Sequence, residues 1–387
     1  MTDPNSERWN RQRLRSNNEW LLLERLRTSG AASRAQLARD SGLSKPTVST
    51  ALAALEQAGL VREAGTVAPD RGRIAVLYEA DPSAGHVLGV DIGRDWLRLG
   101  IADLAGAVVA RLDVPNKGRS ATAVAQAVVA AAAEVTEAAG LGRDDVAEAV
   151  VGTPGVFDEG TGRVRYAVKL PGWGRTGLIE GMRQGLGIPL TVHNDANLAA
   201  LGEYAFGAGV NSRLFVYVMI GTGLGMGVVA DGELFRGAHG AAGEIGFMPS
   251  GRGTVEDAVS GDAVVRAARE FGMSGPLSAK LVFEEARLGA PAAVAAVQQE
   301  AQRLARVVAS LSAVLDPDLV VLGGGVGHSA DLLLNTLEQT LHELTPLRPR
   351  VGASALGEDA VLLGAIATAL RLARPQVFDR RTGQASG

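Results

Sequence analysis

The first 60 residues combine helical patterns of apolar residues with two polar turn signals. Behind Ser33, a residue type that caps helix N-termini, apolar side chains recur at helical spacing until Gly42, which permits the left-handed backbone of a sharp turn. Ser44 begins a second helical pattern, with Pro46 in its first turn. Upstream, residues 18–28 predict an amphipathic helix that closes a small core. We therefore expect three short helices, two of them joined by a tight turn.

The polar face of the second helix in this pair is the feature that suggests a function. Val48, Leu52 and Leu55 form its buried stripe, which leaves polar side chains facing outward near its start. In helix-turn-helix proteins this part of the second helix enters the major groove, where hydroxyls and a lysine contact phosphates and base edges. The candidate DNA-binding residues of this helix are Ser44, Lys45, Thr47, Ser49 and Thr50.

Two strand patterns follow, at residues 60–63 and 74–78, with Arg71 and Arg73 in the loop between them. Such a hairpin is typical of a wing whose arginines reach an adjacent minor groove. The alternative is a small domain that binds protein, but the turn, the caps, the outward polar face and the basic loop together favour DNA. We predict a winged helix-turn-helix domain over residues 1–80.

Charge is distributed unevenly along the 387 residues. Residues 1–80 hold 12 Lys and Arg against 9 Asp and Glu, whereas the rest of the chain holds 26 against 33. A basic front and an acidic remainder fit phosphate binding at the front alone. The chain contains no cysteine, which excludes disulfides and thiolate metal sites. No apolar run has the length of a membrane span and no signal-peptide pattern opens the chain, so we expect a cytoplasmic protein without membrane contact.

From residue 85 the pattern changes to strands that alternate with helices. A three-stranded meander is predicted, covered by an alanine-rich helix at residues 121–139. A similar signature returns at residues 214–220, which run into a glycine-rich turn at 221–227 and another strand. Two lobes of similar design imply an internal duplication with a cleft between the lobes. The three strands of the meander are expected at residues 87–93, 96–102 and 108–110.

A series of motifs in this region resembles the ROK family (repressor, open reading frame, kinase), which comprises sugar kinases and sugar-responsive repressors on the actin-like ATPase fold. The motifs are VDIG at 90–93, TPGVFD at 153–158, NDANLAALGE at 194–203, IGTGLGMGVVADGELFRG at 220–237, GEIGF at 243–247 and LGGGV at 322–326.

The resemblance implies an α/β protein, a winged helix-turn-helix followed by a two-lobed ROK sugar kinase-like body. The first lobe is expected over 85–193 and the second, with sugar-site and dimerisation elements, over 194–372. A C-terminal helix near 373–387 is expected to pack back on the first lobe. The front module is similar to the repressor branch, which includes the xylose and N-acetylglucosamine repressors.

The resemblance also implies a sugar site. Asp195 matches the base that takes a proton from the sugar hydroxyl in the kinases, although here a role in sugar binding is expected. Asn194, Glu244 and Glu256 match residues that hold the ring hydroxyls. Gly155 is expected to let the backbone approach the ligand closely. Trp173 is interpreted as a core residue in preference to a sugar-stacking one.

Two departures from the family pattern bear on metal and nucleotide. The family's histidine in GEIGH, a zinc ligand together with three cysteines, is Phe247 here, and residues 248–254 contain no cysteine. A zinc site of that type is therefore excluded, and we expect no metal and no cofactor, with Phe247 holding this segment by burial. At the first phosphate loop, Asp95 stands where the kinases have a threonine, and its charge repels a triphosphate. The candidate nucleotide residues that match the family are Asp91, Gly93, Gly221, Thr222, Gly223 and Gly324.

The sequence thus predicts a transcriptional regulator, of the repressor type, that binds operator DNA as a homodimer. A sugar or sugar derivative in the interlobe cleft would release it from DNA. Two alternatives remain open at this point: an ATP-dependent sugar kinase with an added DNA-binding module, and a regulator controlled by the docking of a protein partner.

Overall fold

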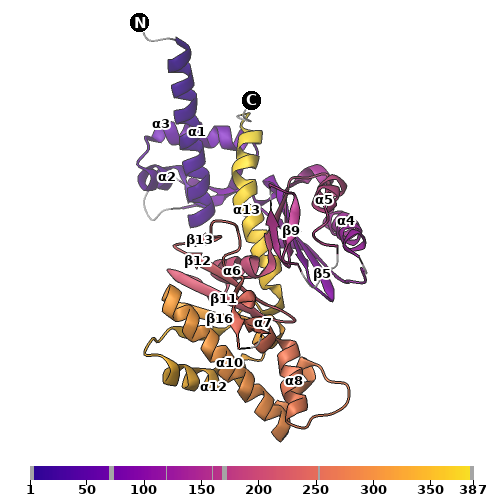
Figure 1. The fold of residues 1–387 in the computed structure, drawn as a ribbon. Helices are drawn as coiled ribbons and strands as arrows, with labels where there is room; N and C mark the ends of the chain where they lie inside the picture. Colours follow the sequence, from indigo (N-terminus) through magenta and orange to yellow (C-terminus); the bar gives the residue numbers. More distant parts are fainter. Residues whose placement is uncertain are drawn as a thin grey trace.

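The computed structural model describes residues 4–68, 74–118, 120–158, 160–167, 172–251 and 253–383, with the backbone alone for residues 4–14. An N-terminal helical domain lies at one end of the molecule, and two five-stranded sheets follow it (Figure 1). One long C-terminal helix runs from between the two sheets to the N-terminal domain (Figure 1).

The N-terminal domain is the predicted winged helix-turn-helix. Ser33 Oγ accepts from the Gln36 N–H at 3.3 Å, Gly42 has a φ of 71°, and Ser44 Oγ accepts from the Thr47 N–H at 3.3 Å. The caps and the turn predicted from the sequence are therefore present. The elements are α1 (Pro4–Ser29), β1 (Ala32–Ser33), α2 (Arg34–Ser41), α3 (Lys45–Gln57), β2 (Val61–Val67) and β3 (Ala75–Ala80), with the strands in the order β1-β3-β2.

The first sheet carries the predicted meander. Strands β4, β5 and β6 are antiparallel neighbours, and β7 and β10 extend the sheet in parallel to give the order β10-β7-β4-β5-β6. Helices α4 and α5 bury one face of it. The bounds are η1 (Pro82–Ala84), β4 (His86–Ile92), β5 (Trp96–Asp103), β6 (Val108–Pro115), α4 (Ala121–Ala138), η2 (Arg143–Asp145), β7 (Val146–Thr153), β8 (Val156–Asp158), β9 (Arg163–Arg165), α5 (Leu178–Leu186) and β10 (Leu190–Asn194).

The second sheet repeats this topology in the order β13-β12-β11-β16-β17, again an antiparallel hairpin next to parallel strands. The internal duplication predicted from the sequence is thus confirmed. Helices α8, α9, α10 and α12 bury one face of this sheet. The bounds are β11 (Leu214–Ile220), β12 (Leu224–Ala230), β13 (Glu233–Leu234), η3 (Ile245–Phe247), β14 (Pro249–Ser250), β15 (Gly253–Thr254), α7 (Val255–Ala258), α8 (Gly261–Glu270), α9 (Ala279–Arg287), α10 (Pro291–Leu315), β16 (Leu319–Gly323), α11 (Gly324–Gly327), α12 (Ala330–Leu344) and β17 (Arg350–Ala353).

Helices α6 (Asp195–Phe206) and α13 (Ala360–Arg381) occupy the space between the sheets, and a short turn η4 (Gly357–Asp359) precedes α13. The two helices cross at glycines: a Cβ on Gly364 would lie 1.8 Å from the Leu198 carbonyl oxygen, and one on Gly202 would lie 2.3 Å from that of Ala360. Only residues without a side chain permit this approach. The same hydrophobic core continues into the N-terminal domain.

Several sequence-based boundaries differ from the structure. The first helix was expected over residues 18–28, but α1 begins at Pro4. A C-terminal helix separated from the second lobe near residue 373 was expected, but α13 is continuous from Ala360 and runs through Pro375. It packs on the first sheet and on α6, and its Phe378 ring packs on Trp20 of α1. Its buried residues on either side of position 372 belong to one core. Strand β12 begins at Leu224, so the last glycines of the predicted 221–227 turn belong to a strand.

Within the described residues, one helical stretch, Gly357–Arg381, is long and apolar enough to cross a membrane by length and composition. Of its most apolar window, 61% is buried inside the protein. Its apolar composition is accounted for by its place in the core between the sheets.

Candidate functional site

The candidate DNA-reading face lies at the N-terminal end of α3. Lys45, Ser49 and Thr50 are exposed there. Thr47 is half-buried, and its hydroxyl lies 2.8 Å from that of Ser44, so these two hydroxyls are engaged with each other at the cap. A lysine and two hydroxyls thus remain directed to solvent on one helix end, as base and phosphate contacts require. The wing arginines Arg71 and Arg73 lie outside the described residues.

The candidate sugar site is built where β10 passes into α6. Asn194 ends the strand and caps the helix: its Oδ1 accepts from the Asn197 N–H at 3.1 Å, and its Nδ2 donates to the Gly155 carbonyl at 3.2 Å. Gly155 has a φ of 89°, and a Cβ there would lie 2.5 Å from the Arg165 carbonyl oxygen. The sequence TPGVFD therefore needs glycine at this position for backbone reasons that do not involve a ligand.

Three carboxylates surround this point, one at the start of α6 and two beside η3 and in α7. Asp195 is half-buried and accepts from the Ala196 N–H at 2.8 Å, and burial raises the pKa of its carboxyl. Burial, and next the charges of Asp195 and Glu256, raise the pKa of Glu244 to about 7. Glu256 accepts from the Leu224 N–H at 3.0 Å. Carboxylates and an amide held in this way accept and donate hydrogen bonds as a polyhydroxyl ligand requires.

The two lobes touch beside these residues. Arg165 of the first lobe donates to the His239 carbonyl of the second at 3.4 Å, and the rings of Tyr166 and Phe247 meet edge-to-face at 5.6 Å. Phe247 is 54% exposed, so the expectation that it holds its segment by burial is wrong. Its ring instead contacts a ring of the opposite lobe.

The segment that carries zinc in the family is held here by hydrogen bonds. Strands β14 and β15 pair, and Thr254 and Asp257 cap α7 reciprocally, at 2.9 Å and 3.2 Å between backbone N–H and side-chain oxygen. With Phe247 in place of the histidine and no cysteine in the chain, the donor set does not fit zinc. Among the described residues, no three acidic or histidine side chains are grouped so that they could hold a metal ion.

The first phosphate loop is closed by an arginine that sequence reasoning missed. Arg98 lies opposite Asp91 in the β4–β5 register, and its Nη1 is 3.4 Å from the Asp91 carboxylate. Asp91 is buried, and burial raises its pKa to about 7 against the lowering effect of Arg98. Arg98 also forms an ion pair with Glu358. The sequence contained a signal for this pair, because the tight hairpin predicted at residues 87–102 places residue 91 opposite residue 98 across its turn.

The remaining candidate nucleotide residues form turns that bond internally. The Gly93 carbonyl accepts from Asn116 Nδ2 at 2.8 Å, and its N–H donates to the Trp96 carbonyl at 3.0 Å. The Gly221 N–H donates to the Gly223 carbonyl at 2.9 Å, and Thr222 lies between them. Gly324 has a φ of 73°, and a Cβ there would lie 2.6 Å from a β11 carbonyl oxygen. Hydrogen bonds within the chain therefore hold these two turns.

Trp173 is 1% exposed and lies in the core of the first lobe, where its indole N–H donates to Thr153. The interpretation of this residue as a core residue is confirmed, and it is not available to stack on a ligand.

A winged helix-turn-helix attached to a duplicated two-lobed α/β body defines the class: a DNA-binding regulator with a sugar kinase-like fold. The model of the ROK family matches residues 87–371, and the chain belongs to this family. The model of the MarR family matches residues 16–63, within the winged helix.

The chain is similar both to sugar kinases and to repressors. The chain is 30% identical to a glucokinase of Halalkalibacterium halodurans over 72% of its own length and 92% of the relative's. It is 26% identical to a putative xylose repressor of a Caldicellulosiruptor species over 90% of its own length and 94% of the relative's. A crystal structure of a ROK family transcriptional regulator, a homologue of the Escherichia coli Mlc protein, matches with a TM-score of 0.76 at 23% identity, over 95% of this chain and 99% of that one. The fold that this chain shares with the regulator structure includes the winged helix.

Proposed function

We propose that this protein is a sugar-responsive transcriptional repressor that acts in the cytoplasm, binds operator DNA through α3 and the wing, and releases it when a sugar binds between the lobes. The observation that carries the proposal is the combination of a reading helix with an exposed polar N-terminal end and a candidate sugar site beside which Arg98 pairs with Asp91 of the first phosphate motif. The similarity to a putative xylose repressor along 90% of the chain supports the same conclusion.

The sugar half of the proposal rests on Asn194, Asp195, Glu244 and Glu256. Asn194 ends β10 of the first sheet, whereas Glu244 and Glu256 follow the hairpin of the second sheet, so a polyhydroxyl ligand that bonds to all of them favours one arrangement of the two sheets over others. Gly155 contributes the carbonyl that orients Asn194. A pentose, a hexose and an amino sugar all have suitable hydroxyls, and the relatives' names direct the first tests to xylose and glucose.

The proposal does not include phosphate transfer, for an electrostatic reason. Arg98 neutralises Asp91, the acidic residue of the first phosphate motif, and Asp95 adds a negative charge in the same loop. A magnesium–triphosphate must displace the ion pair and overcome that charge. We therefore propose that Asp195 binds sugar and transfers no phosphate.

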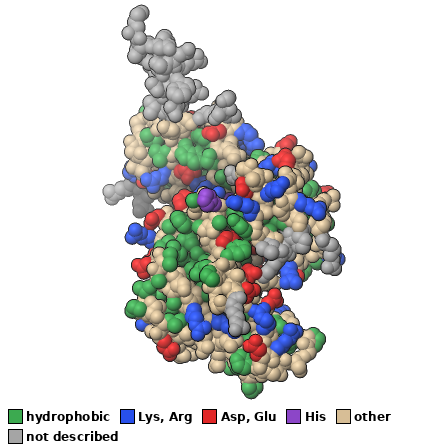
Figure 2. Space-filling model, viewed as in Figure 1, with side chains coloured by type: hydrophobic (Ala, Val, Ile, Leu, Met, Phe, Trp, Pro, Cys, Tyr) green, Lys and Arg blue, Asp and Glu red, His purple; other side chains and the backbone are tan. Residues whose placement is uncertain are grey.

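We propose that the repressor works as a homodimer on a partly palindromic operator. Figure 2 shows apolar side chains gathered on one face of the second lobe over β12 and β13. Exposed large apolar residues of this lobe include Phe206, Val210 and Phe235. Contiguous exposed apolar surface is typical of an interaction site, and a second copy is the occupant that a palindromic reader needs.

Fluorescence anisotropy on DNA from the upstream region of its own gene tests the proposal. We expect tight binding that xylose, glucose or N-acetylglucosamine weakens. Lys45→Ala should weaken binding roughly tenfold and lower the salt slope by about 1, because one phosphate contact is lost. Lys280→Ala, at an 86% exposed lysine on α9, is the matched control and should change nothing. Failure of the protein to bind this DNA would contradict the proposal.

The second candidate function is a sugar kinase with an added DNA module, favoured by Asp195 in the base position and by 30% identity to a glucokinase. A coupled ADP assay with the same sugars distinguishes the two. We expect no turnover above the protein-free rate. ATP-dependent turnover that Asp195→Asn abolishes would establish the kinase instead.

A further inference from the structure

A cavity lies at the joint between the DNA-binding domain and the body, away from the sugar-site carboxylates. Its volume is about 360 Å³, and it is lined by α1, by the segment that leads from β3 into η1, by Leu104 and by Arg374 of α13. This volume is in the range of small-molecule sites. The joint therefore has room for a ligand that would touch the DNA-binding domain and the body at once.

The cavity wall is mostly apolar and aromatic. Trp20, Leu23 and Leu26 come from α1, and Leu60 and Leu104 face them from the other elements. The Trp20 ring packs edge-to-face on Phe378 of α13, with ring centroids 5.2 Å apart. An occupant with an apolar body would bury that body against these side chains.

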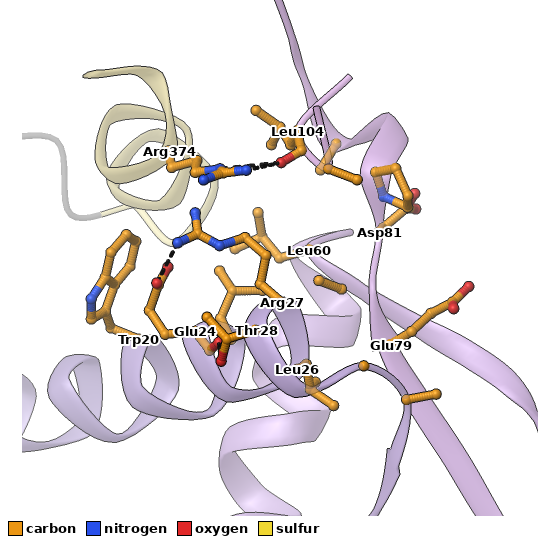
Figure 3. Close-up of a pocket in the computed structure, with 17 residues that line it drawn as sticks. Trp20, Glu24, Leu26, Arg27, Thr28, Leu60, Glu79, Asp81, Leu104 and Arg374 are labelled. Atoms are coloured by element: carbon orange, nitrogen blue, oxygen red, sulfur yellow. Dashed lines mark hydrogen bonds and ion pairs between the residues drawn. The ribbon is translucent and has the colours of Figure 1, made fainter. Parts of the chain in front are cut away.

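Two guanidinium groups share one side of the cavity (Figure 3). Arg374 donates from Nε and Nη2 to the Leu104 carbonyl, at 3.1 and 2.8 Å, and Arg27 is paired with Glu24. Among the described residues, no carboxylate forms an ion pair with Arg374. Burial, and next the charge of Arg27, lower the pKa of Arg374 to about 10. The group of two arginines and one glutamate thus carries a net positive charge in a half-buried place, which the charge of Asp103 offsets only in part, because that carboxylate accepts from the N–H groups of residues 105–107.

The other acidic residues of the wall do not supply that charge. Glu79 and Asp81 lie on the opposite side of the cavity in Figure 3, and both pair with Arg62, at 2.8 and 3.7 Å. Planar guanidinium groups bind a carboxylate through two parallel hydrogen bonds, and this bond is strong where water is partly excluded.

We propose that this cavity binds a small organic carboxylate with an apolar body, whose carboxylate pairs with Arg27 and Arg374 and whose body contacts Trp20 and the leucines. The ligand bridges α1 of the DNA-binding domain to α13 of the body and so fixes the angle between them. Its effect on DNA affinity rests on the proposed repressor function, but its binding does not.

Calorimetric titration of the full-length protein with benzoate and octanoate tests the binding. Benzyl alcohol and octan-1-ol serve as the neutral counterparts. We expect saturable binding of one carboxylate per chain, with the alcohols at least tenfold weaker. Arg374→Gln and Arg27→Gln should each weaken carboxylate binding at least tenfold. Arg371→Gln is the matched control, because Arg371 lies on the same helix but pairs with the exposed Glu233.

Arg27→Gln leaves the Arg374–Leu104 hydrogen bonds in place. Weaker binding in this variant therefore reports the loss of a ligand contact, and not a change in how the DNA-binding domain packs on the body. No saturable binding of either carboxylate, or binding that survives both substitutions, would overturn the proposal. Anisotropy on DNA then measures the regulatory consequence: the carboxylate should change DNA affinity in the wild type but not in Arg27→Gln, while the sugar response persists in both. A protein that binds carboxylate but no DNA would refute the repressor function and leave the site intact.

Discussion

Glu300 has a buried carboxyl group without a hydrogen-bond partner among the described residues. It lies in the middle of α10 at 1% exposure, and neither carboxylate oxygen has a hydrogen-bond partner among the described residues. Burial raises its pKa to about 8, against the lowering effects of Arg303 and Arg266. The folded protein therefore keeps this group neutral at pH 7, whereas the unfolded chain ionises it.

Glu300→Gln should stabilise the protein in a pH-dependent way. A raised folded-state pKa contributes stability that is complete below the unfolded pKa of 4.5 and is lost as the pH rises to about 8. The glutamine cannot ionise, so it avoids that loss. We expect a gain on the order of a few kcal/mol at pH 8.5 and little change at pH 5, measured by urea unfolding.

The matched control for this prediction is Glu338→Gln on α12, at an exposed glutamate. It should leave the unfolding midpoint unchanged at both pH values. An equal gain for Glu300→Gln at pH 5 and pH 8.5 would show that ionisation of this residue is not the cause.

Glu244 should give the proposed sugar site its own pH dependence. Its pKa is raised to about 7, so the free site holds a protonated Glu244 at pH 6 and a carboxylate at pH 8. A carboxylate accepts hydrogen bonds from sugar hydroxyls, and the protonated form loses part of this capacity. We expect sugar affinity to fall as the pH drops below 7, by up to roughly tenfold per pH unit. Calorimetry between pH 6 and 8 measures this.

Glu244→Gln should bind sugar more weakly and with a flat pH profile. Burial also raises the pKa of the neighbouring Asp195, which makes it the other candidate for this titration. A slope that persists in Glu244→Gln would contradict the assignment to Glu244.

At the scale of elements, the crossing of α6 and α13 depends on two glycines. A Cβ on Gly364 would lie 1.8 Å from the Leu198 carbonyl oxygen, so Gly364→Ala must push the two helices apart. Overpacking of this kind costs roughly 1–3 kcal/mol. The control is Gly181→Ala on α5, where a Cβ meets nothing within 4 Å.

Gly181→Ala should stabilise the protein slightly, by up to about 1 kcal/mol, since alanine is the better helix former. Thermal unfolding of the two variants should therefore shift in opposite directions. Similar shifts in both would mean that helix propensity, and not the close approach, governs these positions.

Elements with local signals were predictable from the sequence. Ser33, Gly42 and Ser44 mark the ends of α2 and α3 by hydrogen bonds to nearby backbone, and the meander follows from apolar alternation. The continuity of α13 was not predictable in this way, because Pro375 suggests a break and only the tertiary core on both sides of it maintains the helix.

The candidate site was predictable as a set of residue types but not as a set of contacts. The motifs locate Asn194, Asp195, Glu244 and Glu256, and the structure shows which hydrogen bonds hold Asn194 and Glu256. The Arg98 ion pair was missed although the predicted hairpin of residues 87–93 and 96–102 already places Arg98 opposite Asp91. The cavity around Trp20 joins segments that are far apart in the chain, so no local pattern indicates it.

At the scale of the whole molecule, α13 is the physical link between the proposed sugar site and the DNA-binding domain. Its first turns pack against α6, which begins at Asp195, and its last turns pack against Trp20 of α1. A change in lobe arrangement at the sugar site therefore moves a rigid helix that ends at the DNA-binding domain. Coupling between two sites requires such an element with contacts to both.

Trp20→Leu should weaken this coupling while it preserves both binding events. Leucine keeps an apolar side chain in the joint but removes the edge-to-face contact with Phe378, a loss of about 0.5–1.5 kcal/mol. The measured quantity is the ratio of DNA dissociation constants with and without saturating sugar, which should fall toward 1. Trp96→Leu, at a 43% exposed tryptophan on β5, is the matched control and should keep the full ratio. If Trp20→Leu retained that ratio as well, the signal would have to reach the DNA through another contact, and the segment that joins β3 to β4 would be the next place to substitute.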